Sequence, residues 1–275
     1  MISVLILTLN EEQDLPGCLD SVAWCDDIHV FDSGSTDRTA EIARERGAKV
    51  TVRPFDSFAA QRNASMQLPF RYPWLLVLDA DERPTPELNA EMPRAIAAVA
   101  PAVAAFRIHR RDFLWGTWLK HTQMTSSYLR LLRVGHVQYT RAINEITTVD
   151  GEIADLKNPF DHLAFSKGIA HWVNKHNEYS TREADLLASG DATQRASLRE
   201  ALFAKGMQQR RVAQKAIFYR LPLRPLIKWL YLMFVRGAIL DGSAGLMYAT
   251  LISFYEYLIE AKYREILRRR ANLPL

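Results

Sequence analysis

Acidic residues are missing from one long stretch of this 275-residue sequence. Residues 201–240 contain no Asp or Glu but carry eight Lys and Arg residues, so the formal net charge of +4 arises in the C-terminal part. Such an excess of positive charge favours binding to nucleic acid, to an anionic membrane or to a phosphorylated substrate. Because no recognisable nucleic-acid-reading motif is present, nucleic acid is not expected as a partner.

Long uninterrupted apolar runs are also missing. Lys228, Arg236, Asp241 and Glu256 break up the apolar C-terminal region, so no stretch of about 20 uncharged apolar residues is available for a membrane-spanning helix. The short apolar run over residues 2–9 lacks a preceding basic region, unlike a secretory signal. The sequence therefore predicts a cytoplasmic protein.

Cysteine is scarce. Cys18 and Cys25 are expected on one helix, nearly two turns apart, which is too far for a relaxed disulfide. Free thiols in a reducing compartment are the expected state.

Two glycine-rich phosphate-binding motifs are absent. The sequence has neither G-x-G-x-x-G nor G-x-x-x-x-G-K-[ST], which disfavours dinucleotide oxidoreductases and P-loop enzymes. A sugar nucleotidyltransferase usually has a Gly-rich basic loop after its first strand, whereas the loop here is acidic.

Apolar runs alternate with helix-like segments in the first hundred residues, which predicts a mainly parallel sheet. Strands are expected at residues 2–7, 28–31, 49–52 and 74–78, and helices at 14–24, from the residue after Asp37 to Gly47, and from Thr85 onward. Residues 102–110 and 127–134 are expected to be later strands of a mixed sheet. The chain is predicted to be helical from Lys167, with a break at Pro222 and Pro225.

Polar residues follow three of the expected strands, at 8–12, 32–37 and 79–82. In open α/β sheets ligands bind beyond the carboxyl ends of the strands, so these loops are expected to converge on one rim. Asp79 and Asp81 are the sharpest feature. Carboxylates two residues apart can direct one side chain to a nucleotide ribose and the other to a divalent cation that bridges two phosphates, and hard oxygen ligands suit Mg²⁺ or Mn²⁺.

The other two loops leave alternatives open. Asp32 is a candidate acceptor for a nucleobase or ribose, with small neighbours that let a ligand approach the backbone. The alternative is a simple turn and helix cap, for which Ser35 or Asp37 would also serve. Arg62 is a candidate for contact with the base or the diphosphate, or for a surface salt bridge.

Residues 8–12, 32–37, 61–63 and 78–82, in this order and spacing, resemble the family 2 inverting glycosyltransferases, which have the GT-A fold. The resemblance is greatest to the branch with the lipopolysaccharide core β-glucosyltransferases and extends to residues 130–133, 156–159, His162 and 236–242. It implies an α/β fold of GT-A type, with a Rossmann-like mixed sheet and flanking helices. The donor-binding residues that it implies are Thr8, Asn10, Glu11, Asp32, Ser35, Arg62 and Asp79.

The family implies a single displacement, in which a carboxylate removes the acceptor proton and a metal neutralises the departing nucleoside diphosphate. Glu145 is the candidate base, where the branch has a His-Glu pair; Asn144 replaces the usual His. The alternative for Glu145 is an exposed strand carboxylate. Asp81 and His162 are the candidate ligands for Mg²⁺ or Mn²⁺, although the imidazole of His162 is equally compatible with a structural role.

Two domains are expected: residues 1–165 as the GT-A catalytic domain and residues 166–275 as a helical region. In the helical region cations interleave with aromatic and aliphatic residues, as in helices that lie in a membrane interface. The alternative is a helical cap that packs on the catalytic domain or on another subunit.

These observations predict a peripheral enzyme at the cytoplasmic face of the inner membrane. It would transfer sugar from a nucleotide-sugar, with UDP the first choice, to a membrane-embedded saccharide. A polyprenyl phosphate acceptor and a non-catalytic nucleotide-sugar-binding assembly protein are the alternatives.

Overall fold

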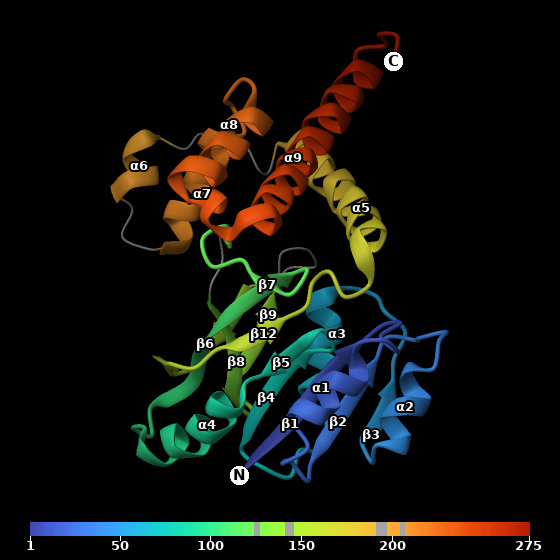
Figure 1. The fold of residues 1–275 in the computed structure, drawn as a ribbon, viewed down its shortest axis with the longest axis vertical. Coiled ribbons are helices and arrows are strands. Elements are labelled where there is room, and N and C mark those ends of the chain that lie inside the picture. The colour runs from blue at the N-terminus through green and yellow to red at the C-terminus, as the bar shows by residue number, and fades with distance from the viewer. Residues whose placement is uncertain (124–126, 141–145, 191–196, 204–206) are drawn as a thin grey trace. The chain divides into compact units, whose positions relative to one another are not determined.

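The computed structural model describes residues 1–123, 127–140, 146–190, 197–203 and 207–275. The chain forms two compact units (Figure 1). Unit 1 comprises Met1–Phe113 with Gln123–Ser166, and unit 2 comprises Leu114–Thr122 with Lys167–Leu275. The predicted boundary divides the chain once, after residue 165, whereas the second unit also includes the segment Leu114–Thr122.

Unit 1 is built on a mixed sheet whose strands follow the order β3-β2-β1-β4-β8-β6-β12-β5. The parallel part consists of β1 (Ile2–Thr8), β2 (Ile28–Asp32), β3 (Lys49–Val52) and β4 (Trp74–Asp79). The mixed part consists of β5 (Glu82–Pro84), β6 (Val103–Leu114), β8 (Ser127–Arg133) and β12 (Phe160–His162), with β11 (Glu152–Asp155) paired to β6. A separate hairpin joins β9 (Val137–Thr140) to β10 (Ile146–Val149).

In the part of unit 1 that the structure describes, the sheet is flanked by the helices α1 (Leu15–Ser21), α2 (Thr39–Glu45), α3 (Phe58–Ser65) and α4 (Pro86–Ala98). Helix α4 begins next to Thr85, as predicted, and the Thr85 hydroxyl caps it by accepting from the backbone N–H of Leu88 at 3.2 Å. The prediction for the first helix is wrong at its end, because α1 stops at Ser21 and Cys25 lies beyond it. Both cysteines are free thiols.

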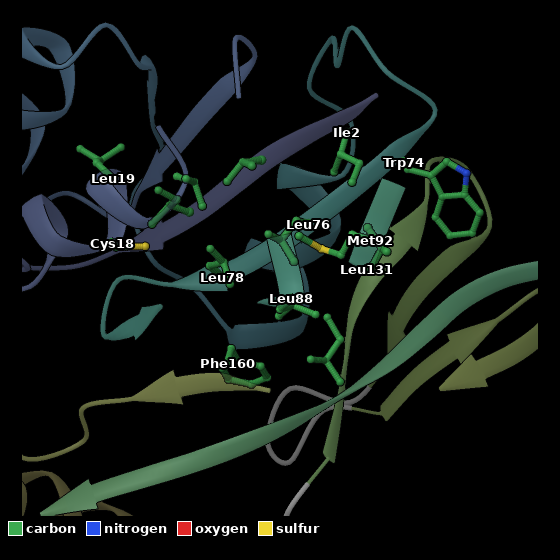
Figure 2. Packing of buried hydrophobic residues seen from close by; sticks show 14 of the residues in the cluster. Ile2, Cys18, Leu19, Trp74, Leu76, Leu78, Leu88, Met92, Leu131 and Phe160 are labelled. Atoms are coloured by element: carbon green, nitrogen blue, oxygen red, sulfur yellow. The ribbon is translucent and has the colours of Figure 1, made fainter. Parts of the chain in front are cut away.

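The central parallel strands β1, β2 and β4 are buried on both faces, as parallel sheets usually are, whereas the edge strand β3 is partly exposed. Because side chains alternate along a strand, Leu76 and Leu78 of β4 pack on one side, with Leu88 and Met92 of α4. Figure 2 shows these four side chains together with Phe160, which begins β12. This core fixes the strands whose ends carry the polar loops.

Unit 2 is helical in its C-terminal part. Its elements are α5 (Gly168–Ser189), α6 (Leu198–Phe203), α7 (Met207–Phe218), α8 (Arg224–Leu230), a π-helical turn η2 (Tyr231–Val235), a 3₁₀ turn η3 (Ala238–Asp241) and α9 (Gly242–Arg270). Helix α7 ends at Phe218 and α8 begins at Arg224. Pro222 therefore lies between the two helices and Pro225 is the second residue of α8, so the break is where the sequence predicts it.

A close backbone approach joins η3 to α9. A Cβ atom on Gly245 would lie 2.0 Å from the carbonyl oxygen of Ala238, so a side chain does not fit at this position. Within the described residues no single helix is both long and apolar enough to cross a membrane. The helical segments Arg224–Val235 and Ala238–Arg270 are together long and apolar enough, but the chain bends by 71° between them.

Candidate active site

The carboxyl ends of the three central strands lie at one edge of the sheet. β1 is parallel to β2 with Thr8 beside Asp32, and parallel to β4 with Leu7 beside Asp79. The loops that follow these strands therefore start next to one another. This is the arrangement that the polar strand ends predict.

Asp32 and Thr8 are buried side by side at the ends of β2 and β1. The Oδ2 of Asp32 accepts from the hydroxyls of Thr8 at 2.8 Å and Ser35 at 2.5 Å. Its Oδ1 accepts from the backbone N–H groups of Gly34 at 3.0 Å and Ser35 at 2.8 Å. Four hydrogen bonds satisfy a carboxylate, so Asp32 organises the loop after β2 in this structure.

The loops after β1 and β2 are joined by further hydrogen bonds. The Asn10 N–H donates to the Ser35 hydroxyl at 2.8 Å, and the Asn10 Oδ1 accepts from the Thr36 N–H at 2.8 Å. The Glu11 N–H donates to the Thr39 hydroxyl at 2.7 Å. The structure thus brings Thr8, Asn10, Asp32 and Ser35 into one network, and their contact with a donor nucleotide stays a prediction.

Three consecutive polar residues of helix α3 make three different contacts. The Gln61 amide donates to the Ser33 hydroxyl at 3.0 Å. Arg62 lies on the face toward β4, where its Nη2 is 3.3 Å from the Asp79 Oδ1. The Asn63 side chain exchanges two hydrogen bonds with the Tyr139 backbone, at 2.7 and 2.9 Å. Arg62 is therefore paired with Asp79, and its contact with a base or a diphosphate stays a prediction.

Asp79 is held by two arginines. The Arg130 Nη2 lies 2.8 Å from the Asp79 Oδ2 and also pairs with Glu82. Desolvation raises the pKa of Asp79, but the guanidinium groups of Arg130 and Arg62 outweigh it and hold that pKa well below its usual range. Burial raises the pKa of Glu82, although Arg130 opposes the shift. Asp79 is therefore ionised and oriented at the end of β4.

Asp81 faces His162 across the edge of the sheet. The His162 Nε2 lies 3.3 Å from the Asp81 Oδ2, and the Leu163 N–H donates to the Asp81 carbonyl at 2.9 Å. β12 brings His162 there because it pairs with β5 on one side and β6 on the other. The two carboxylates of the D-x-D segment thus have different surroundings.

A second acid contacts the other nitrogen of His162. The His162 Nδ1 lies 2.6 Å from the Asp112 Oδ1. Burial alone lowers the pKa of His162, but its hydrogen bonds with Asp112 and Asp81 outweigh burial and raise that pKa to about 9. The imidazole therefore links two carboxylates.

Asp81 and His162 together offer one oxygen donor and one nitrogen donor to a divalent cation. A carboxylate oxygen and an imidazole nitrogen, both partly exposed, face each other at Asp81 and His162. Among the described residues no group of three or more His, Cys, Asp or Glu side chains is arranged to hold a metal ion. Mg²⁺ is commonly bound by one or two protein groups together with phosphate oxygens and water, so a two-residue site fits a cation that arrives with a diphosphate.

The comparison with known proteins decides the family. The sequence profile described as "Glycosyl transferase family 2" matches residues 3–152, more than half of the chain. The chain belongs to glycosyl transferase family 2. The observed mixed sheet and this assignment confirm the predicted fold class, an α/β fold of GT-A type.

Two curated relatives of this family 2 glycosyltransferase align over nearly the whole chain. The "Lipopolysaccharide core biosynthesis glycosyltransferase LpsC" of Rhizobium meliloti (strain 1021) is 28% identical, with 99% of this chain and 96% of that protein covered. An uncharacterized glycosyltransferase of Rickettsia typhi (strain ATCC VR-144 / Wilmington) is 25% identical, with 99% and 89% covered. The solved structure of S. aureus TarS 1-349 covers 96% of this chain and 91% of its own at 14% identity, but its TM-score of 0.42 is too low to support an argument.

The candidate base of the glycosyltransferase, Glu145, lies outside the described residues, as does Asn144. Its role stays a prediction from the sequence. The described residues around it, Tyr139 on β9 and Ile146 on β10, belong to the hairpin of unit 1.

Three contributors to the site were not identified from the sequence: Arg130, Glu82 and Asp112. Arg130 and Glu82 lie in the segments 130–133 and 78–82 that carry the family resemblance, which gives neither of them a role of its own, and Asp112 belongs to no motif. The signal in each case is a charged residue inside or next to an apolar strand, where burial requires a partner of opposite charge. All three side chains are buried, and each is paired with a residue of the candidate site or with another of the three.

Proposed function

We propose that this family 2 glycosyltransferase is a metal-dependent inverting enzyme. It transfers a sugar from a nucleotide-diphosphate donor, with UDP-sugar the first candidate, to a saccharide of the lipopolysaccharide core type. The metal would be held by Asp81 and His162. The saccharide acceptor is supported by the near full-length similarity to LpsC, and the metal by the facing pair of donors.

The arrangement of Asp81 opposite His162 carries this proposal. A bound Mg²⁺ or Mn²⁺ supplies neutralisation of the charge that develops on the leaving diphosphate. Asp79, fixed by Arg62 and Arg130, would orient the donor through its ribose, and Glu145 would take the proton of the acceptor hydroxyl.

A panel of nucleotide-sugars tests the donor and the metal together. The full-length protein is incubated with each donor and Mn²⁺, and release of nucleoside diphosphate is measured with and without EDTA. We expect release from a UDP-sugar that EDTA abolishes and Mn²⁺ restores. Release that EDTA leaves unchanged would refute metal dependence, and release from donors of another nucleotide alone would refute the choice of UDP.

We also propose that unit 2 holds the enzyme on the cytoplasmic face of the inner membrane, as a peripheral protein. Large apolar side chains are exposed along α8, η2 and η3; Phe234 is 66% exposed and Leu240 is 71% exposed. The acid-free segment 201–240 supplies cations around them. Each Lys or Arg near an anionic lipid surface contributes about 1 kcal/mol to binding.

Sedimentation with liposomes tests this membrane proposal. For the double variant Phe234→Ser/Leu240→Ser we expect at least a tenfold loss of binding to anionic vesicles, because exposed apolar side chains that enter the interface are removed. The matched control is Val52→Ser/Ile153→Ser, which removes two exposed apolar side chains from unit 1. Wild-type binding that is equal for neutral and anionic vesicles at every salt concentration would contradict the proposal.

A further inference from the structure

Behind His162 lies a buried acid that the sequence did not single out. Asp112 is on β6, and the parallel pairing of β12 with β6 places His162 directly beside it. The Asp112 side chain is 5% exposed. Its Oδ1 accepts the hydrogen bond from the His162 Nδ1 at 2.6 Å, a short contact of the kind made by charged groups.

The orientation of Asp112 is itself fixed. The Arg110 Nη2 donates to the Asp112 Oδ2 at 3.0 Å, and the Arg110 guanidinium carbon lies 4.4 Å from the centre of the Tyr128 ring. The Arg110 Nε also lies 2.8 Å from the Asp112 Oδ1, so Arg110 contacts both carboxylate oxygens, and Oδ1 is shared with His162. A carboxylate held at both oxygens holds the imidazole plane in turn.

We propose that Asp112 is the positioning residue of the metal site. By occupying Nδ1 of His162, it leaves Nε2 as the only ring nitrogen that a cation beside Asp81 can reach. Histidine ligands commonly donate their second ring N–H to a carboxylate, which fixes the tautomer and the ring orientation. This inference rests on the proposed metal-dependent function and adds a residue to it.

A plain cross-strand ion pair would give some of the same contacts, and the same two strands contain one. The Arg111 Nε on β6 lies 2.6 Å from the Asp161 Oδ1 on β12. Asp161 precedes His162, and its side chain points to the other face of the strand because side chains alternate. Asp161→Asn is therefore a matched control, which breaks an ion pair between β6 and β12 and leaves His162 untouched.

The experiment measures metal binding and the imidazole directly, without turnover. Mn²⁺ is titrated into full-length wild type, Asp112→Asn and Asp161→Asn in the presence of UDP, and free Mn²⁺ is read by electron paramagnetic resonance. We expect the Mn²⁺ affinity of Asp112→Asn to fall about 10- to 100-fold, the range found when such supporting groups are removed. For Asp161→Asn we expect wild-type affinity. Urea unfolding of all three proteins reports any loss of fold.

A second measurement needs no variant. The ¹⁵N NMR signals of His162 in the wild type, with Mg²⁺ and UDP, should show a proton on Nδ1 and none on Nε2. A proton on Nε2 instead, or equal Mn²⁺ affinity of Asp112→Asn and wild type, would overturn the inference while leaving the proposed function intact. Equal weakening by Asp161→Asn would also overturn it. Wild type that binds UDP but no Mn²⁺ would overturn both the metal-dependent function and the inference.

Discussion

Replacing Asp81 with alanine should abolish donor turnover and Mn²⁺-dependent UDP binding together. Among the described residues, only the Asp81 carboxylate is placed opposite the His162 Nε2. Losing a ligand that stabilises the leaving diphosphate by about 4 kcal/mol corresponds to about a 10³-fold lower rate. The measurements are nucleoside diphosphate release and UDP affinity, each with and without Mn²⁺.

The control for Asp81→Ala is Asp20→Ala, on helix α1. Asp20 is an exposed carboxylate that pairs with Arg46 on the surface, and such pairs contribute little to stability. We expect Asp20→Ala to keep full turnover. Unchanged turnover in Asp81→Ala would remove this residue from the metal site.

Replacing Glu145 with glutamine should separate donor binding from transfer. If Glu145 takes the acceptor proton, the amide of the variant cannot, and transfer should fall about 10²- to 10⁴-fold. Binding of UDP with Mn²⁺ should be unchanged, because Asp81 and His162 remain. The measurements are sugar transfer to a saccharide acceptor and UDP affinity in the same protein samples.

Glu152→Gln, on the exposed part of strand β11, is the control for Glu145→Gln. It removes a carboxylate from the same unit and should leave transfer unaffected. Normal transfer by Glu145→Gln to a saccharide would exclude Glu145 as the base. Transfer that survives only with a polyprenyl phosphate acceptor would instead favour that alternative, since an anionic phosphate oxygen needs no base.

The parallel half of the sheet was predictable because its signals are local. Each strand is a short apolar run, and β3 was predicted with its observed bounds, Lys49–Val52. The ends of β1, β2 and β4 were each predicted one residue short, since Thr8, Asp32 and Asp79 are polar but still pair in the sheet. A polar residue at these positions therefore does not indicate that the strand has ended.

The candidate site was predictable where a strand-end motif or the family resemblance marks its residues. Asp79 and Asp81 form a motif by themselves, and their position after an apolar strand gives the motif its meaning. Arg130 and Asp112 come from strands that are distant along the chain, and only the order β4-β8-β6-β12 brings them to the motif. No local pattern shows which buried charge will meet which partner.

The hydrogen bond from the Leu163 N–H to the Asp81 carbonyl has a consequence for how the protein is made. During synthesis on the ribosome, the strands β1 to β4 emerge well before β12. The nascent chain can thus complete its parallel half while the D-x-D turn still lacks both its anchor and the imidazole opposite it. Contacts of such wide sequence separation form late in folding, so catalytic competence is expected only after residue 163 has left the exit tunnel.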